Sequence, residues 1–181
     1  MESLIGELIS LIGEDSERDG LQRTPQRVRK AIDFLTEGYN RDPLSVVGDA
    51  IFEVEAKNLV VVRDIEFYSL CEHHMLPFFG RAHIGYIPTG RVVGLSKIPR
   101  LVDLFAHRLQ VQERLTEQIA DSMDALLSPA GVAVVLNSSH MCMMMRGVEK
   151  QRSTTYSSAF RGLLAMDPMY REEFLHAVNT K

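Results

Sequence analysis

The pattern of apolar positions first indicates two helices near the N-terminus. Residues 3–12 are apolar on several faces, so we predict a helix that packs against another element instead of lying on a surface. Thr24 followed by Pro25 is typical of a helix start, with the threonine as N-cap. Apolar side chains then repeat at helical spacing over residues 28–35, and Gly38 is expected to end this second helix.

After these helices the apolar positions alternate or form β-branched runs, which is typical of strands. We predict strands at residues 51–55, 58–69, 80–88 and 91–95. The dipeptide Thr89–Gly90 between the last two runs predicts a hairpin that joins them.

The spacing of apolar residues changes again in the second half of the chain. Residues 96–127 have a helical pattern with an interruption at 109–111, so we predict two consecutive helices. Two further strands are expected at residues 131–141 and 143–158. Asp167–Pro168 then begins a short C-terminal helix.

The order of these elements indicates an α+β fold. Because strands and helices do not alternate one by one, we predict an antiparallel β-sheet with two long helices on one face, preceded by the N-terminal helices. We expect residues 1–45 to form a helical N-terminal segment and residues 46–181 to form the main domain.

The composition is that of an ordinary globular protein and argues against nucleic acid and membrane as partners. Of the 181 residues, 45% are hydrophobic and 24% are charged, which argues against wholesale disorder. The formal net charge of −4 argues against a general nucleic-acid binder. Apolar runs are too short for a membrane span and no signal-peptide pattern is present, so we expect a cytoplasmic protein with no membrane partner.

Two short clusters contain both cysteines of the chain. Cys71 and His74 follow a predicted strand with Cys-x2-His spacing, which lets both reach one metal across a tight turn. His140 and Cys142 lie near the end of another predicted strand, where residues two apart face the same side. Two thiolates and one imidazole suit zinc and leave a fourth position open, as in catalytic zinc sites.

Other interpretations of these clusters stay open. His73 and His140 are both candidates for a fourth ligand, which would close the site. For either cluster alone, unrelated buried thiols and surface histidines are the simplest alternative. A disulfide is disfavoured because we expect a reducing compartment. The methionines around Cys142 are more typical of core packing than of metal ligation.

Polar residues outside the two clusters are candidates for binding an anion and a guanidine-like group. Ser96, Lys97 and Arg100 open a predicted helix, and helix N-termini with added cations bind phosphates well. Arg146 follows the second cluster; solvated surface charge is the alternative for each of these cations. Gln112–Glu113 lies at the interruption between two helices, where it either caps the helix or offers a carboxylate to a guanidine-like edge.

Longer strings of residues resemble one enzyme family. They are EFYSLCEHHMLPFFG, HIGYIP, GLSKI, LVDLFAHRLQVQERLTEQIA and HMCMMMRGVEK, with TPQRVRKA and FLTEGY near the N-terminus. These strings are similar to those of GTP cyclohydrolase I, a zinc-dependent enzyme family at the start of folate-type pterin synthesis. The resemblance covers about residues 15–165 and is far more specific than Cys-x2-His alone.

The resemblance implies a role for each candidate residue. The implied zinc ligands are Cys71, His74 and Cys142. The implied catalytic residues are His140, His73 and Ser96. The residues implied to bind the guanine edge are Glu113 and, assisting it, Gln112. The other implied substrate contacts are Leu95, Lys97, Arg100 and Arg146, with Arg27 and Lys30 supplied by a neighbouring subunit.

The resemblance also implies a fold and an assembly. The family fold is the tunnelling fold, an antiparallel sheet backed by two helices, in which five subunits close a large β-barrel. Two such rings stack into a homodecamer with active sites between subunits. An N-terminal helix with apolar faces suits such an assembly.

The implied reaction is the hydrolysis of GTP, with Zn²⁺ as cofactor, to formate and 7,8-dihydroneopterin triphosphate. Water adds to the imidazole ring of the purine, and His140 protonates the ring nitrogen as the bond breaks. Glu113 selects guanine, because adenine lacks the pair of donors that a carboxylate accepts. The alternatives are a tunnelling-fold relative acting on another purine or pterin, and a catalytically silent zinc protein with a closed site.

Overall fold

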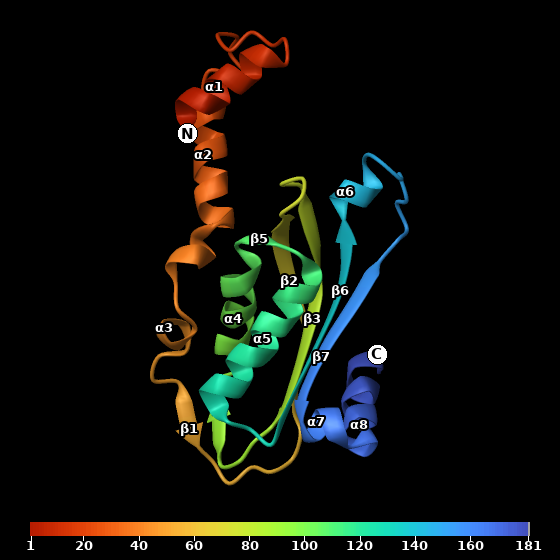
Figure 1. Cartoon of the computed structure of the whole chain (residues 1–181). Coiled ribbons are helices and arrows are strands. Elements are labelled where there is room, and N and C mark those ends of the chain that lie inside the picture. The colour runs from red at the N-terminus through yellow and green to blue at the C-terminus, as the bar shows by residue number, and fades with distance from the viewer. Residues whose placement is uncertain (181) are drawn as a thin grey trace.

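A computed structural model describes residues 1–180 of the chain. The N-terminal elements are α1 (Glu2–Leu11), α2 (Thr24–Leu35), the 3₁₀ helix η1 (Glu37–Asn40) and α3 (Pro43–Val47). Helices α1 and α2 form an arm that extends beyond one end of the sheet (Figure 1). Both helices are as predicted, but Thr24 is the first residue of α2 and Arg23 is its N-cap.

Gly38 is required for packing and does not end α2. The helix ends at Leu35, and Gly38 is buried in η1. A Cβ atom at position 38 would lie 2.0 Å from the carbonyl oxygen of Leu104. Only glycine therefore lets η1 approach the helix that contains Leu104 this closely.

The strands form one large and one small sheet. The large sheet has the order β5 (Leu109–Gln110), β2 (Val60–Cys71), β3 (Pro77–Ile87), β6 (Gly131–His140) and β7 (Thr155–Gly162). Neighbouring strands are antiparallel except β2 and β5, which are parallel. The small sheet pairs β1 (Ile51–Glu53) with β4 (Arg91–Val93).

The predicted hairpin around Thr89–Gly90 is wrong. The chain does turn there, with Gly90 at a φ of 99°, but the next strand, β4, pairs with β1. Both edges of β3 are already occupied by β2 and β6, so β4 has no free edge of β3 to pair with.

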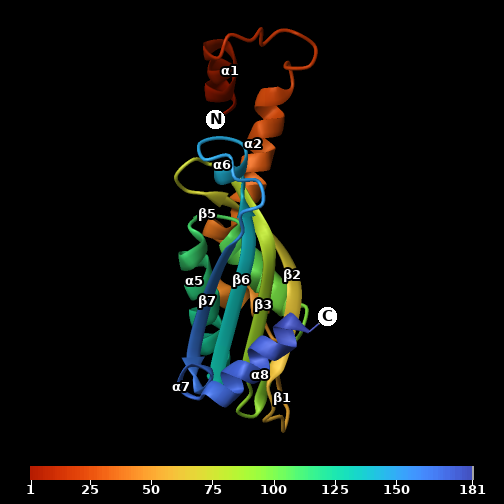
Figure 2. The same ribbon diagram turned by 90° about the vertical axis from the view of Figure 1, so that its right-hand side faces the viewer.

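Helices lie on both faces of the large sheet. The predicted pair, α4 (Lys97–Ala106) and α5 (Gln112–Leu127), covers one face, with the expected interruption between them. The C-terminal helices α7 (Leu163–Met166) and α8 (Pro168–Asn179) lie against the other face at the end away from the arm (Figure 2). The prediction of two helices on one face is confirmed, and the predicted C-terminal helix adds a layer on the other face.

Two apolar cores follow from this arrangement. The larger one lies between the sheet and the α4–α5 layer, and the smaller one lies under α8. Phe174 of α8 is fully buried over Gly85, where a Cβ atom would lie 2.6 Å from the Phe174 ring. Within residues 1–180, no helix is both long and apolar enough to cross a membrane.

The predicted strand over residues 143–158 is too long. Met141–Met144 instead form a short helix, α6, and β7 begins only at Thr155. The residues between them are mostly polar and exposed, so a strand there would have no apolar face to bury.

Candidate active site

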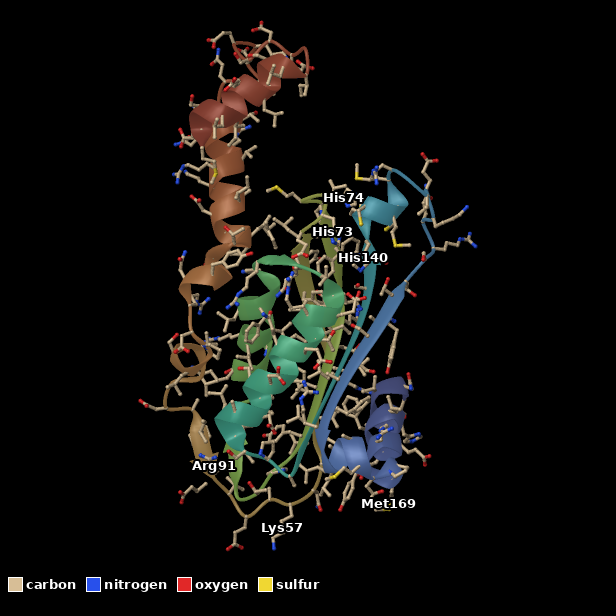
Figure 3. All side chains as sticks on the ribbon, in the orientation of Figure 1. Lys57, His73, His74, Arg91, His140 and Met169 are labelled. Atoms are coloured by element: carbon tan, nitrogen blue, oxygen red, sulfur yellow. The ribbon has the colours of Figure 1, made fainter. Side chains whose placement is uncertain are left out.

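Three potential metal ligands converge at the arm end of the sheet. One ligand atom each of Cys71, His74 and Cys142 lies within 4.8 Å of the other two. The Sγ atom of Cys71 is 4.0 Å from Nδ1 of His74. His73, His74 and His140 gather at this same end, far from Lys57 and Arg91 (Figure 3). Residues 71 positions apart in the sequence therefore meet at one point.

The first two ligands lie on a tight turn between β2 and β3. The backbone N–H of Met75 donates to the carbonyl of Cys71 over 2.8 Å, and the N–H of Cys71 donates to Leu76 over 2.9 Å. Met75 adopts a φ of 52°, which reverses the chain within this turn. This hydrogen-bonded turn holds Cys71 and His74 on the same side.

The third ligand reaches the site from a helix. The prediction that His140 and Cys142 face the same side of one strand is wrong, because β6 ends at His140 and Cys142 lies in α6. The change from strand to helix after His140 turns the chain toward β3, which α6 contacts. Cys142 thereby approaches Cys71 even though the expected alternation is absent.

The donor set fits a zinc ion. Thiolate and imidazole ligands bind zinc at about 2.0–2.3 Å, so ligand atoms around one ion lie about 3.3–3.8 Å apart. The ligand atoms of the cluster lie within 4.8 Å of one another, somewhat farther apart than this range, so it is the types of donor atom that match zinc. Burial, followed by the proximity of Cys71, raises the pKa of the Cys142 thiol. A bound cation would oppose this shift by stabilising the Cys142 thiolate.

His140 is held firmly beside this cluster. Its ring stacks on Phe78 with a centroid distance of 4.7 Å and an angle of 3° between the rings. Its Nε2 atom lies 2.9 Å from Oε1 of Gln112. Burial lowers the pKa of His140, and the nearby Glu113 carboxylate opposes this effect. The imidazole is therefore neutral near pH 7 and available to take up a proton.

Other predicted residues surround the cluster. Arg146 Nη1 lies 3.5 Å from Nε2 of His74, and Nδ1 of His73 lies 3.8 Å from Sγ of Cys71. Glu113 is exposed at the start of α5, whereas the neighbouring Gln112 is only 1% exposed and lies beneath this surface.

The remaining predicted residues lie elsewhere in the same chain. Leu95, Ser96, Lys97 and Arg100 are at the start of α4, and Nζ of Lys97 donates to the carbonyl of Val46. A helix of ten residues is about 15 Å long, and its far end leads to β5 beside Cys71. Two further exposed cations, Arg27 and Lys30, lie on the α2 arm.

Several residues around His140 were missed by sequence reasoning. They are Phe78, Ser138, Ser157 and Thr116, which stack on His140 or join the hydrogen-bond network of Gln112. Thr116 lies one helical turn after Gln112 and Ser138 lies two residues before His140, but Phe78 and Ser157 come from other strands, and no local spacing connects these two to His140. Only the register of β3, β6 and β7 brings them together.

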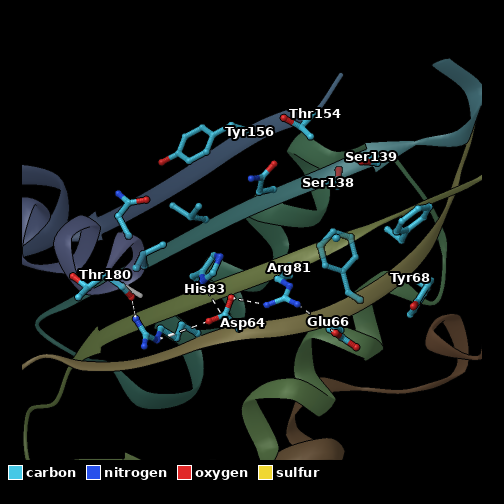
Figure 4. Close-up of a pocket in the computed structure, with 18 residues that line it drawn as sticks. Asp64, Glu66, Tyr68, Arg81, His83, Ser138, Ser139, Thr154, Tyr156 and Thr180 are labelled. Atoms are coloured by element: carbon cyan, nitrogen blue, oxygen red, sulfur yellow. Dashed lines mark hydrogen bonds and ion pairs between the residues drawn. The ribbon is translucent and has the colours of Figure 1, made fainter. Parts of the chain in front are cut away.

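A cavity on another part of the sheet is separate from this cluster. It has a volume of about 830 Å³ and lies on the sheet face opposite α4 and α5 (Figure 4). Asp64, Arg81, His83 and Tyr156 are among its lining residues. Arg81 donates to Asp64 over 3.0 Å, so its principal charges neutralise each other within the chain.

Comparison with known proteins gives a consistent result. The family model described as GTP cyclohydrolase I matches residues 1–179. A protein of Leptospira biflexa named GTP cyclohydrolase 1 is 57% identical over 180 residues, covering 99% of this chain and 98% of the relative. A protein of the same name from Deinococcus radiodurans is also 57% identical, covering 98% of this chain and 82% of the relative.

A solved structure shares the fold. It is the archaeosine synthase QueF-Like in the apo form, with a TM-score of 0.51 and 19% identity. The likeness covers 60% of this chain and 97% of that chain. At this identity the likeness concerns the fold alone, and it agrees with the tunnelling fold expected from the sequence.

Proposed function

This chain belongs to the GTP cyclohydrolase I family, and from that membership we propose a role for each candidate residue. The activity is that of the family: hydrolysis of GTP at the first step of pterin and folate biosynthesis, with release of formate and formation of 7,8-dihydroneopterin triphosphate. The convergence of Cys71, His74 and Cys142 beside His140 carries the proposal for the site.

We propose that Cys71, His74 and Cys142 hold a zinc ion. The mixed thiol and imidazole set favours zinc over harder cations, which prefer oxygen ligands. When bound, zinc supplies the Lewis acidity that lets water attack carbon at neutral pH. A set of three protein ligands is typical of catalytic zinc sites, whereas structural zinc sites usually have four.

His140 is proposed as the group that moves the proton. Its neutral imidazole can take a proton from water and return it to the purine ring nitrogen as the ring opens. His73, which lies on the ligand turn, is proposed as a second participant beside it. Ser96 is proposed to act later, on the ribose oxygens.

Glu113 is proposed to recognise guanine. Its exposed carboxylate can accept from N1–H and from the 2-amino group, a donor pair that adenine lacks. Gln112 assists from beneath, since its buried amide is hydrogen-bonded inside the protein.

The triphosphate residues are proposed to come from more than one copy of the chain. Leu95, Lys97 and Arg100 lie a helix length from the ligand turn, whereas Arg146 lies beside His74. A site completed between subunits reconciles these positions, with Arg27 and Lys30 of a neighbouring arm adding positive charge. In the described residues, the outer edge of β7 is unpaired and β5 covers only the end of β2.

These open edges support a ring assembly. Edge strands that remain unpaired are ready to join another sheet. We propose that five sheets join edge to edge into a barrel and that two rings form a decamer. In this arrangement residues 1–45 serve mainly assembly and residues 46–181 carry the fold and the zinc site. We also propose that the enzyme works in the cytoplasm, where thiol ligands stay reduced.

A direct assay tests the proposed site. Zinc-loaded protein is incubated with GTP, and formate and pterin fluorescence are measured with and without a chelator. Activity that disappears with chelation and returns with zinc supports the metal assignment. Zinc-loaded oligomer that yields no formate would instead favour a catalytically silent zinc protein with a closed site.

A further inference from the structure

A buried amide lies behind the proposed proton-transfer residue. Gln112, at the start of α5, is 1% exposed, and its side chain contacts strands β6 and β7. Burying a polar amide without hydrogen-bond partners costs free energy, so the Gln112 amide is expected to be hydrogen-bonded.

The orientation of the Gln112 amide is set by two backbone carbonyls. Nε2 lies 3.2 Å from the carbonyl oxygen of Leu136 and 3.0 Å from that of Thr155. Carbonyl oxygens only accept hydrogen bonds, so the NH₂ group must face them. Oε1 must therefore point the other way, toward the end of β6.

Two hydroxyl groups reinforce this orientation. Nε2 of Gln112 donates to Oγ of Ser157 over 2.9 Å, and Thr116 Oγ1 donates to the backbone carbonyl of Gln112 over 2.8 Å. Because the Thr116 proton is already used, Ser157 donates to Thr116 across their 2.7 Å contact. The three residues form a closed ring of hydrogen bonds that fixes the amide.

The fixed oxygen of Gln112 determines where His140 carries its proton. Oε1 accepts only, and it lies 2.9 Å from Nε2 of His140, so Nε2 must be protonated. Ser138 also donates to this oxygen, and its Oγ lies 3.2 Å from Nε2. The parallel Phe78 ring prevents the imidazole from tilting out of this contact.

We propose that Gln112 is a positioning residue that holds His140 in the tautomer protonated on Nε2, so that Nδ1 exchanges the proton during catalysis. The inference rests on the proposed role of His140. Glu113 follows Gln112 in the same turn of α5, so guanine recognition and the orientation of the imidazole depend on the same helix start. A guanine ring bound by Glu113 would therefore lie at a defined position relative to His140, whose tautomer is fixed.

The test compares two buried glutamines. Gln112→Met removes the acceptor opposite His140 while keeping the side-chain length. Gln110→Met is the matched control, because Gln110 is also 1% exposed and hydrogen-bonds to Phe105 and Gln118 instead of His140. Oligomer mass and zinc content are measured first, so that both variants are compared as folded holoenzyme.

Two readouts separate positioning from structural support. We expect kcat of Gln112→Met to fall by about 10- to 100-fold, with little change in KM, and kcat of Gln110→Met to change less than threefold. Nitrogen NMR of ¹⁵N-histidine-labelled holoenzyme should show a protonated Nε2 on His140 in the unaltered protein and in Gln110→Met. In Gln112→Met a population protonated on Nδ1 should appear.

Further variants keep the outcome decisive. If Gln112→Met does not fold, Gln112→Glu retains an acceptor opposite Nε2, so its His140 should keep the Nε2–H tautomer. An unchanged kcat and tautomer in Gln112→Met, equal losses in both Met variants, or an Nδ1–H tautomer in Gln112→Glu would each overturn the inference. A His140→Ala enzyme of normal kcat would overturn the role of His140 itself, which is a different failure.

Discussion

Strand β6 has two halves that hold their neighbours in different ways. From Gly131 to Leu136 every residue is buried, and the side chains alternate between the core under α5 and the core under α8. From Asn137 to His140 the strand is polar, and Ser138 and His140 make directional hydrogen bonds to Gln112.

The difference shows what each kind of contact specifies. Apolar burial is non-directional, so the first half of β6 fixes the layers of the fold without fixing single atoms. Hydrogen bonds require a partner at a given distance and angle, so the second half places individual nitrogen and oxygen atoms. Substitutions in the two halves should therefore separate stability from activity.

The largest expected effect is at the metal cluster. Cys142→Ala removes one of two thiols and should abolish bound zinc and formate production together, since metal affinity depends on the full ligand set. Metal analysis and the GTP assay measure the two losses. Met145→Ala, at a 59% exposed position on the same segment, is the control and should retain both.

The next effect concerns recognition of the base. Glu113→Ala should lower kcat/KM for GTP by about 10- to 100-fold, because a charged group loses its hydrogen bonds to guanine. Zinc content should stay normal. GTP binding measured by calorimetry gives the direct comparison, and unchanged binding would show that Glu113 does not contact the base.

A substitution in the apolar region should affect stability and spare the site. Phe174→Ala opens a cavity over Gly85 and should reduce the free energy of unfolding by about 3–5 kcal/mol. Below the lowered melting temperature, kcat should be close to normal. Met169→Ala on the same helix, at a 64% exposed position, should leave both quantities unchanged.

The smallest expected effect is a change in how the free energy of unfolding depends on pH. Burial lowers the pKa of His83 below its usual 6.5, with Asp64 opposing and Arg81 and Arg63 adding to the shift. The unfolded state therefore binds the proton more readily. The stability from neutral His83 is complete above pH 6.5 and is lost as pH falls from there through the folded pKa.

His83→Gln tests this sign. Glutamine keeps an acceptor for the N–H of Asp64, which donates to Nδ1 of His83 over 3.2 Å, and it does not titrate. Denaturant unfolding of zinc-saturated protein between pH 5 and 8 should show a flatter dependence than the unaltered protein. The exposed His176→Gln should keep the original slope; a steeper slope in His83→Gln would contradict the prediction.

The sequence predicted the positions of helices and strands better than it predicted which strands pair. Apolar periodicity identified α2, α5 and β6, because burial on one or two faces leaves a periodic signal, and the helix-start signal at Asp167–Pro168 identified α8. Pairing leaves no such signal. The turn at Gly90 was expected, yet nothing local indicated that β4 would pair with β1.

The candidate site was predictable to the same extent. The unusual residue types at Cys71, His74 and Cys142 indicated metal binding whatever the local structure, so this cluster was found even though Cys142 lies on a helix. The buried network of Gln112 includes common polar residues that are distant in the sequence, such as Ser138 and Ser157 at 26 and 45 positions from Gln112. Only the strand register reveals that they meet.

The meeting of Cys71 and Cys142 has a thermodynamic consequence. An ion held by both would cross-link positions 71 residues apart, as a disulfide does, and would restrict the unfolded chain. For a loop of this length, the loss of chain entropy corresponds to about 4 kcal/mol. The melting temperature should therefore rise with free zinc concentration, so metal supply would set how long the enzyme persists as well as how fast it turns over.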